Sequence, residues 1–161
     1  WAPDNTIWLT TFGSVYSVNP DNGAKQLLTT IPDYSVLGSK QIGIAFHPDF
    51  NSNHYVYIDY NYAGEVYNDP VPFDLYMKIV RYTYNEDLNT LENPVGIIDD
   101  IKIFSGYHDG GKMLIADNHI FLTVGDARQV ENPEDHPYIN PGDPYLPQNL
   151  DVYSGKILRI N

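Results

Sequence analysis

The chain contains no cysteine, which excludes disulfides and thiol chemistry. Basic residues are also scarce, since 9 Lys and Arg stand against 21 Asp and Glu and give a net charge of -12. This charge repels phosphate backbones and anionic lipid surfaces, so nucleic acid is not expected as a partner. No apolar run approaches the roughly 18 residues of a membrane span, so membrane insertion is not expected either.

Two further absences concern the start of the chain and its secondary structure. Trp1 stands in place of an initiator Met, and no basic and apolar leader follows it, so we expect a processed or truncated end. No segment shows the period of an amphipathic helix. The 14 Tyr, the many Asn and the short charged patches favour an exported β-protein, and we expect an extracytoplasmic location.

What the chain does have is a series of β-strand patterns. Turn sequences such as Asn-Pro, Pro-Asp, Asp-Asn-Gly and Gly-Gly separate them. An all-β fold is therefore expected. Alternating or β-branched runs predict strands at residues 6–10, 14–18, 26–30, 42–46, 55–60, 78–84, 96–104, 112–115, 120–124 and 156–160.

An internal repeat indicates how these strands are arranged. The turn-and-strand sequence of residues 3–10 recurs at 116–123, and a longer version occupies 47–58. About 113 positions separate Asn5 from Asn118 over two units, so one unit is about 56 residues, near the length of a propeller blade. The repeat predicts a β-propeller of four-stranded antiparallel blades, of which about two to three are present.

The predicted blades divide the chain into three parts. Residues 1–34 form a first blade without its innermost strand, 35–105 a complete blade, and 106–161 a third blade without its outermost strand and with a long loop at 128–149. Open blades expose unpaired strand edges, which proteins cover. We therefore expect the remaining blades or another chain to cover them, and residues 1–161 alone to be poorly soluble or bound to other protein.

One pair of residues has the chemistry of a general base. His108 precedes one predicted strand and Asp126 follows the next, so both lie at the same end of neighbouring strands. A histidine takes a proton near neutral pH, and a carboxylate within reach orients it. The same residues also suit structural roles, His108 as a turn residue bonded to a neighbouring loop and Asp126 as a cap on the turn that follows.

Several motifs carry a resemblance to a known family. Residues 42–50, Ile-Gly-Ile-Ala-Phe-His-Pro-Asp-Phe, resemble the Gly-Leu-Leu-Gly-φ-Ala-Phe-His-Pro-Asp-Phe signature of soluble pyrroloquinoline quinone (PQQ) dependent sugar dehydrogenases, the glucose/sorbosone dehydrogenase family. The resemblance covers nearly the whole chain but only about the first third to half of a typical member. Further matching motifs follow in the family's order at residues 81–85, 90–95, 108–111, 124–126 and 155–161.

The resemblance implies an oxidoreductase on a six-bladed propeller, with PQQ over the top face near the central channel and held partly by calcium. It implies hydride transfer from the sugar C1 to the quinone, with His108 as general base and Asp126 as its support. The partners would be a small sugar and an electron acceptor. The calcium ligands, a further catalytic Arg and most PQQ contacts are expected downstream of Asn161, so residues 1–161 alone are not expected to oxidise a sugar.

The chain departs from the family where the quinone is contacted. Gly38 stands where the family has Gln or Glu, and Gln41 substitutes for it only if the loop shifts. After Asp126 the family often has Gly, Arg, Asn and Gln, whereas this chain has the shorter run Ala127, Arg128 and Gln129. Arg128 or Gln129 is therefore the residue expected to reach a quinone carboxylate. Gln41, Arg128 and Gln129 are therefore the cofactor-binding candidates.

Two long polar segments, 61–76 and 128–149, are expected as loops that wall a cleft. The second suits a hard cation such as calcium but lacks the alternating order of a calcium loop, so no metal ligand is assigned. Tyrosine rings in these loops have apolar faces that suit stacking on sugars. The tyrosines concerned are Tyr62, Tyr67, Tyr138 and Tyr145.

Two rival functions remain open. One is a non-catalytic extracellular propeller of the same ancestry, a binding or assembly module, which Gly38 and the missing downstream ligands favour. The other is a calcium-dependent propeller hydrolase such as a lactonase, which predicts a carboxylate cluster at the channel that this segment does not show. His47 is interpreted as a structural turn residue, and the remaining histidines, His54, His119 and His136, have no paired metal-ligand spacing.

Overall fold

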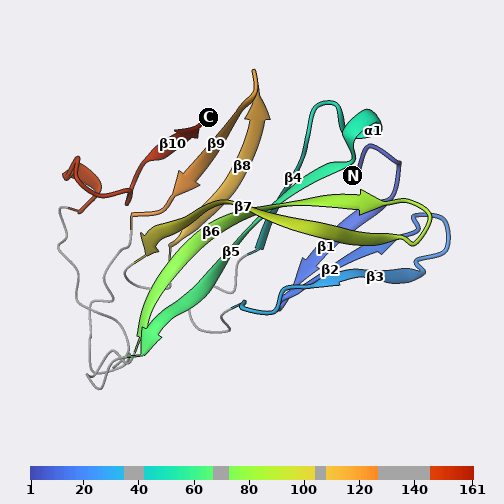
Figure 1. Cartoon of the computed structure of the whole chain (residues 1–161), viewed down its shortest axis with the longest axis horizontal. Coiled ribbons are helices and arrows are strands. Elements are labelled where there is room, and N and C mark those ends of the chain that lie inside the picture. The colour runs from blue at the N-terminus through green and yellow to red at the C-terminus, as the bar shows by residue number, and fades with distance from the viewer. Residues whose placement is uncertain (35–41, 67–72, 104–107, 127–145) are drawn as a thin grey trace.

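The computed structural model describes residues 1–34, 42–66, 73–103, 108–126 and 146–161. The chain forms three antiparallel sheets that follow one another along the sequence, with the middle sheet between the other two (Figure 1). Each strand predicted from the sequence is present, 14–18 and 42–46 with the predicted bounds and the others with one or both ends shifted. Among the described residues, no helix is long and apolar enough to cross a membrane.

The first sheet has three strands in the order β1 (Ile7–Thr11), β2 (Ser14–Val18) and β3 (Lys25–Thr30). A tight turn joins β1 to β2, and Gly13 takes a φ of 79° there, a conformation that glycine adopts without strain. Val15 on β2 is completely buried, because it faces the middle sheet.

The middle sheet has four strands in the order β4 (Ile42–Phe46), β5 (Tyr55–Val66), β6 (Phe73–Asn85) and β7 (Thr90–Ile103). One helical turn, α1 (Phe50–Asn53), connects β4 to β5. The prediction that residues 61–76 form a loop was wrong for residues 61–66 and 73–76, which continue β5 and β6. Pairing between these strands, such as Asn61 opposite Met77, extends the ladder beyond the run that the sequence pattern suggested.

The third sheet has the order β10 (Ile157–Ile160), β9 (His119–Val124) and β8 (Gly110–Ala116). Asp117 and Asn118 form the turn between β8 and β9, and both have positive φ, as two-residue hairpin turns require. A short 3₁₀ helix, η1 (Leu146–Gln148), precedes β10.

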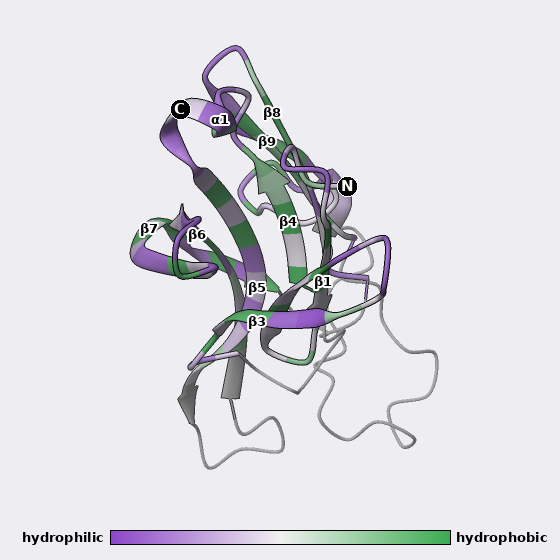
Figure 2. Ribbon diagram, turned by 90° about the vertical axis from the view of Figure 1, so that its right-hand side faces the viewer, coloured by the Kyte–Doolittle hydropathy of each residue, from purple (hydrophilic) through white to green (hydrophobic). Residues whose placement is uncertain are grey.

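Two apolar layers hold the sheets together. Alternate residues of β5 face opposite sides, so Val56 and Ile58 pack toward the first sheet, while Tyr57 packs toward the third. Most of the hydrophobic residues lie on the strands, whereas hydrophilic residues mark several connecting turns (Figure 2). Because β5 is covered on both faces, polar residues on it require buried partners. The second layer, between the middle and third sheets, contains Met77, Ile79, Ile101, Ile103, Met113, Ile120, Leu122 and Val124.

The inner strands of neighbouring sheets lie against one another. Strand β4 contacts both β1 and β8. The Thr10 hydroxyl donates a hydrogen bond of 3.0 Å to the Ile42 carbonyl, which ties β1 to β4. The contact of β4 with β8 brings the end of β8, where the candidate site lies, next to the middle sheet.

Candidate functional site

The structure brings together the histidine and the carboxylate that the sequence paired. His108 lies just before β8 and Asp126 just after β9, and these strands are antiparallel neighbours. The His108 Nδ1 atom lies 3.3 Å from the Asp126 Oδ1 atom. The two side chains are 56% and 47% exposed, so a ligand can reach them.

Close backbone packing fixes the loop that carries His108. The Gly125 amide donates to the Asp109 carbonyl over 2.8 Å, and a Cβ at position 125 would overlap the His108 carbonyl group. Gly110 has a φ of 90° and packs against the Thr123 carbonyl, where a Cβ would also overlap. The glycines of both motifs are therefore required for the approach of the two strand ends.

A buried polar pair lies directly behind this loop. Asp109 is 3% exposed and Asn61, on β5 of the middle sheet, is 1% exposed. The Asn61 Nδ2 atom donates a hydrogen bond of 2.7 Å to Asp109 Oδ2. The hydrogen bond joins the two sheets beside His108 and supplies one of the hydrogen bonds that a buried carboxylate requires.

A second carboxyl, Asp59, is buried two residues earlier on the same face of β5. It is 1% exposed, and neither side-chain oxygen has a hydrogen-bond partner of good geometry. Burial raises the pKa of Asp59 to about 8, although the backbone amides of Asp59 and Gly43 favour the charged form. A Cβ at Gly43 would overlap both the Asp59 carboxyl and the Gly111 carbonyl oxygen, so these two oxygens lie close together. A neutral carboxylic acid, which can donate to a carbonyl, suits this position better than a carboxylate.

The loop end before β10 is also held in place. The Lys156 ammonium group donates to three backbone carbonyls, those of Pro147 at 3.0 Å, Asn149 at 2.8 Å and Ser154 at 2.7 Å. The Gly155 amide donates to the Gly125 carbonyl over 2.7 Å. Lys156 thus holds the described end of the 128–149 loop, and its neighbour Gly155 binds Gly125, the residue that precedes Asp126.

The cofactor-binding candidates lie outside the described residues. These are Gln41, Arg128 and Gln129, and the same holds for Gly38 and His136. Of the tyrosines expected to stack on sugars, only Tyr62 is described. Its ring stacks on Tyr76 with a centroid separation of 5.7 Å, and the Lys78 ammonium lies 4.3 Å from its centroid. The Tyr62 ring is therefore already in contact with side chains of the protein itself.

The other described histidines make contacts outside the loop that carries His108. The His47 ring accepts a hydrogen bond of 3.0 Å from the Asp49 amide, which agrees with a turn residue. His54 ends α1 with a φ of 56°, and the His119 ring lies 2.6 Å from the Asp117 carbonyl. The described residues contain no group of three His, Asp or Glu side chains arranged to hold a metal ion.

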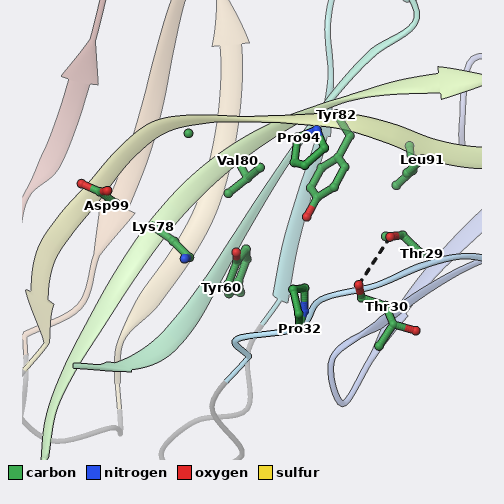
Figure 3. Close-up of a pocket in the computed structure, with 11 residues that line it drawn as sticks. Thr29, Thr30, Pro32, Tyr60, Lys78, Val80, Tyr82, Leu91, Pro94 and Asp99 are labelled. Atoms are coloured by element: carbon green, nitrogen blue, oxygen red, sulfur yellow. Dashed lines mark hydrogen bonds between the residues drawn. The ribbon is translucent and has the colours of Figure 1, made fainter. Parts of the chain in front are cut away.

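A separate cavity of about 380 Å³ opens between the first and middle sheets (Figure 3). Thr29 and Thr30 of β3 line one side, and Tyr60 and Lys78 line another. Asp33 accepts from the Tyr60 hydroxyl at 2.9 Å and forms an ion pair with Lys78. The cavity lies on the face of β5 and β6 that is turned away from the third sheet, and it does not include His108 or Asp126.

Three antiparallel sheets with their inner strands in contact are arranged as blades of a β-propeller. The family model for glucose/sorbosone dehydrogenase matches residues 1–161, and the chain belongs to this family.

Comparison with individual proteins agrees with this family. The chain is 30% identical over 174 residues to quinoprotein glucose dehydrogenase B of Acinetobacter calcoaceticus, which covers 100% of this chain and 36% of that protein. The solved structure of the soluble aldose sugar dehydrogenase of Escherichia coli, in its apo form, superposes with a TM-score of 0.74 and 21% identity over 98% of this chain and 41% of that one. A solved glucose dehydrogenase gives a TM-score of 0.74 with 19% identity, over 100% of this chain and 46% of that one. The chain thus spans less than half the length of these relatives.

Proposed function

We propose that this chain is part of a PQQ-dependent aldose dehydrogenase in which His108 accepts the hydroxyl proton of the sugar. The observation that carries the proposal is the 3.3 Å contact of His108 Nδ1 with Asp126 Oδ1, half exposed at the strand ends, in a chain of the glucose/sorbosone dehydrogenase family. The name of the Acinetobacter relative, a quinoprotein glucose dehydrogenase, supports both the cofactor and the substrate class.

The contact with Asp126 assigns different tasks to the two nitrogens of the His108 ring. Nδ1 faces the carboxylate, which leaves Nε2 to accept a proton from a substrate hydroxyl. Asp126 holds the ring orientation and stabilises the imidazolium that forms once the proton has moved. The geometry therefore supports a base that is accessible to substrate and already oriented.

The oxidation itself requires a group that no side chain supplies. When bound, PQQ would accept the hydride from the sugar C1, since amino-acid side chains do not accept hydride. An exposed base without a redox group of its own fits that division of tasks. Gln41, Arg128 and Gln129 remain the candidates to hold PQQ, and calcium ligands are expected mostly outside this segment.

The remaining parts of the proposal concern organisation and location. The three sheets support blades at 1–34, 35–105 and 106–161, with further blades or another chain completing a six-bladed ring. We propose an electron acceptor as second substrate and an extracytoplasmic location, the latter supported by the composition of the chain with its 14 Tyr and many Asn.

Steady-state dye reduction tests this proposal on the longest natural polypeptide that contains these residues. After loading with PQQ and calcium, glucose should reduce the dye, and His108→Ala should lower kcat by roughly 10²- to 10⁴-fold because it removes the base. His119→Ala is the matched control, since that ring lies at the opposite end of β9 and contacts Asp117. Full activity of His108→Ala would show that His108 is not the base.

A non-catalytic propeller is the second candidate. It is favoured by Gly38, which stands where the family places a Gln or Glu that contacts the quinone. A PQQ titration separates the two functions, because a binding or assembly module would give no change in the PQQ spectrum at any cofactor concentration.

A further inference from the structure

The backbone next to His108 is held by a buried hydrogen bond from another sheet. Asp109 follows His108 directly and accepts a bond of 2.7 Å from Asn61 Nδ2. Both side chains are almost inaccessible, at 3% and 1% exposure. Hydrogen bonds to a buried carboxylate are short, strong and directional, so this one restricts the orientation of Asp109.

His108 requires such a restraint from its surroundings. Its φ is 56°, a left-handed conformation that is unfavourable for a residue with a Cβ and persists only where neighbouring structure imposes it. Its side chain is 56% exposed, so packing around the ring is sparse. The position of the imidazole therefore depends on the backbone on either side of Cα.

That backbone is fixed from two directions at Asp109. The Gly125 amide donates to the Asp109 carbonyl over 2.8 Å, within the third sheet. Asn61 binds the Asp109 side chain from the middle sheet. Asn61 itself is well placed to do so, because it lies within β5 opposite Met77, which is completely buried. A residue on a rigid strand positions a neighbour more accurately than a residue on a loop.

We propose that Asn61 is a positioning residue that acts through Asp109 to hold His108 where Nδ1 meets Asp126. An apolar pair at positions 61 and 109 would fill the same space. Without the hydrogen bond, however, the backbone at position 109 would be less restricted in rotation. The kinetic part of this inference rests on the proposed function. The structural part, that Asn61 holds this backbone, stands without it.

The structural part is tested by amide hydrogen exchange at Gly125, whose N–H is bonded to the Asp109 carbonyl. In the longest natural polypeptide, Asn61→Ala should accelerate this exchange by roughly 10- to 100-fold, the effect of losing a hydrogen bond to a charged group. Asp109→Asn retains an acceptor oxygen and should preserve the protection. Unchanged exchange at Gly125 in a folded Asn61→Ala variant would overturn the proposal.

Two further variants keep the test decisive. Asn61→Ala combined with Asp109→Ala removes both partners, leaves no unpaired buried carboxylate and should still lose protection at Gly125. The matched control is Asn85→Ala, because Asn85 also donates to a carboxylate, that of Glu92 at 3.3 Å. Met77 is the residue on β6 that pairs with Asn61, and Asn85 lies roughly 26 Å from it along β6 at the rise per residue of a strand. Replacing Asn85 should therefore leave amide exchange at Gly125 unchanged.

The kinetic part is tested with PQQ, calcium and glucose. Asn61→Ala should lower kcat by up to about 100-fold and leave KM within about threefold, because a misplaced base slows the chemical step. The kinetic isotope effect with C1-deuterated glucose should rise accordingly, which a loss of folded protein would not produce. An unchanged kcat in Asn61→Ala would overturn the kinetic role. If the wild-type protein oxidises no sugar, the proposed function is refuted but the structural role of Asn61 is not. Amide exchange at Gly125 would then test whether Asn61 holds the backbone at Asp109.

Discussion

Replacement of the buried Asp59 by asparagine should make the protein more stable at neutral pH. The carboxyl is 1% exposed and lies beside the Gly111 carbonyl oxygen. Burial raises its pKa from 3.8 to about 8 in the folded protein. Between these two values the folded state holds a proton that the unfolded state has lost, so stability falls as pH rises through this window.

The size of the effect follows from the pKa difference. One pKa unit corresponds to about 1.4 kcal/mol, so Asp59 costs on the order of 4 kcal/mol at pH 7 relative to pH 4. Asp59→Asn keeps the shape of the neutral acid and offers an amide donor to the Gly111 carbonyl without a titration. The variant should match the wild type near pH 4 and exceed it in unfolding free energy by that amount at pH 7.

The assay is urea unfolding of wild type and variant in the longest natural polypeptide that contains these residues, monitored by tryptophan fluorescence at pH values from 3 to 9. Asp33→Asn is the informative control, because its effect should have the opposite sign. Burial opposes ionisation of Asp33, but hydrogen bonds from Lys78 and Tyr60 hold its pKa below its ordinary value. Its loss should destabilise the protein above pH 4 and matter less as pH falls further. A wild-type minus Asp59→Asn difference in unfolding free energy that does not change with pH would show that the Asp59 pKa is not raised by burial.

Two other substitutions test the loop that carries His108. Gly125→Ala should destabilise the protein by about 1 to 3 kcal/mol and abolish activity, because the added Cβ overlaps the His108 carbonyl, whereas Gly96→Ala, where a Cβ meets open space, should do neither. Urea unfolding and dye reduction measure both effects, and a fully active Gly125→Ala would contradict the packing described. Asp126→Asn should lower kcat on the order of 100-fold with KM nearly unchanged, because the ring loses its orienting carboxylate. Equal kcat in that variant and the wild type would exclude the supporting role.

Strand positions were largely predictable because the sequence alternates where one face of a strand is buried. The prediction stopped too early at β5, since Asn61 and the tyrosines and glycine that follow it resemble a loop. Pairing with β6 extends the strand, and that pairing depends on residues distant in sequence. A signal was present in Asp59 and Asn61, which are two apart and so share one face of a strand. On a strand that is covered on both sides, such a spacing indicates a buried polar cluster.

The candidate site was predictable only in part. His108 and Asp126 flank two predicted neighbouring strands, so their proximity follows from hairpin topology. Asn61 was not identifiable as a neighbour of Asp109, because the contact crosses from one sheet to the next and depends on how the blades pack. The cavity beside Tyr60 was missed for the same reason, since it is lined by residues of different sheets.

The role of His108 as the base is tested most directly by a single-turnover measurement on the longest natural polypeptide that contains these residues. Protein loaded with PQQ and calcium is mixed with glucose, and the absorbance of the bound cofactor is followed in the wild type and in His108→Ala. We expect rapid reduction in the wild type and a rate lower by roughly 10²- to 10⁴-fold in the variant, with PQQ bound equally by both. Equal rates in the two proteins, or no reduction in the wild type, would contradict this role of His108.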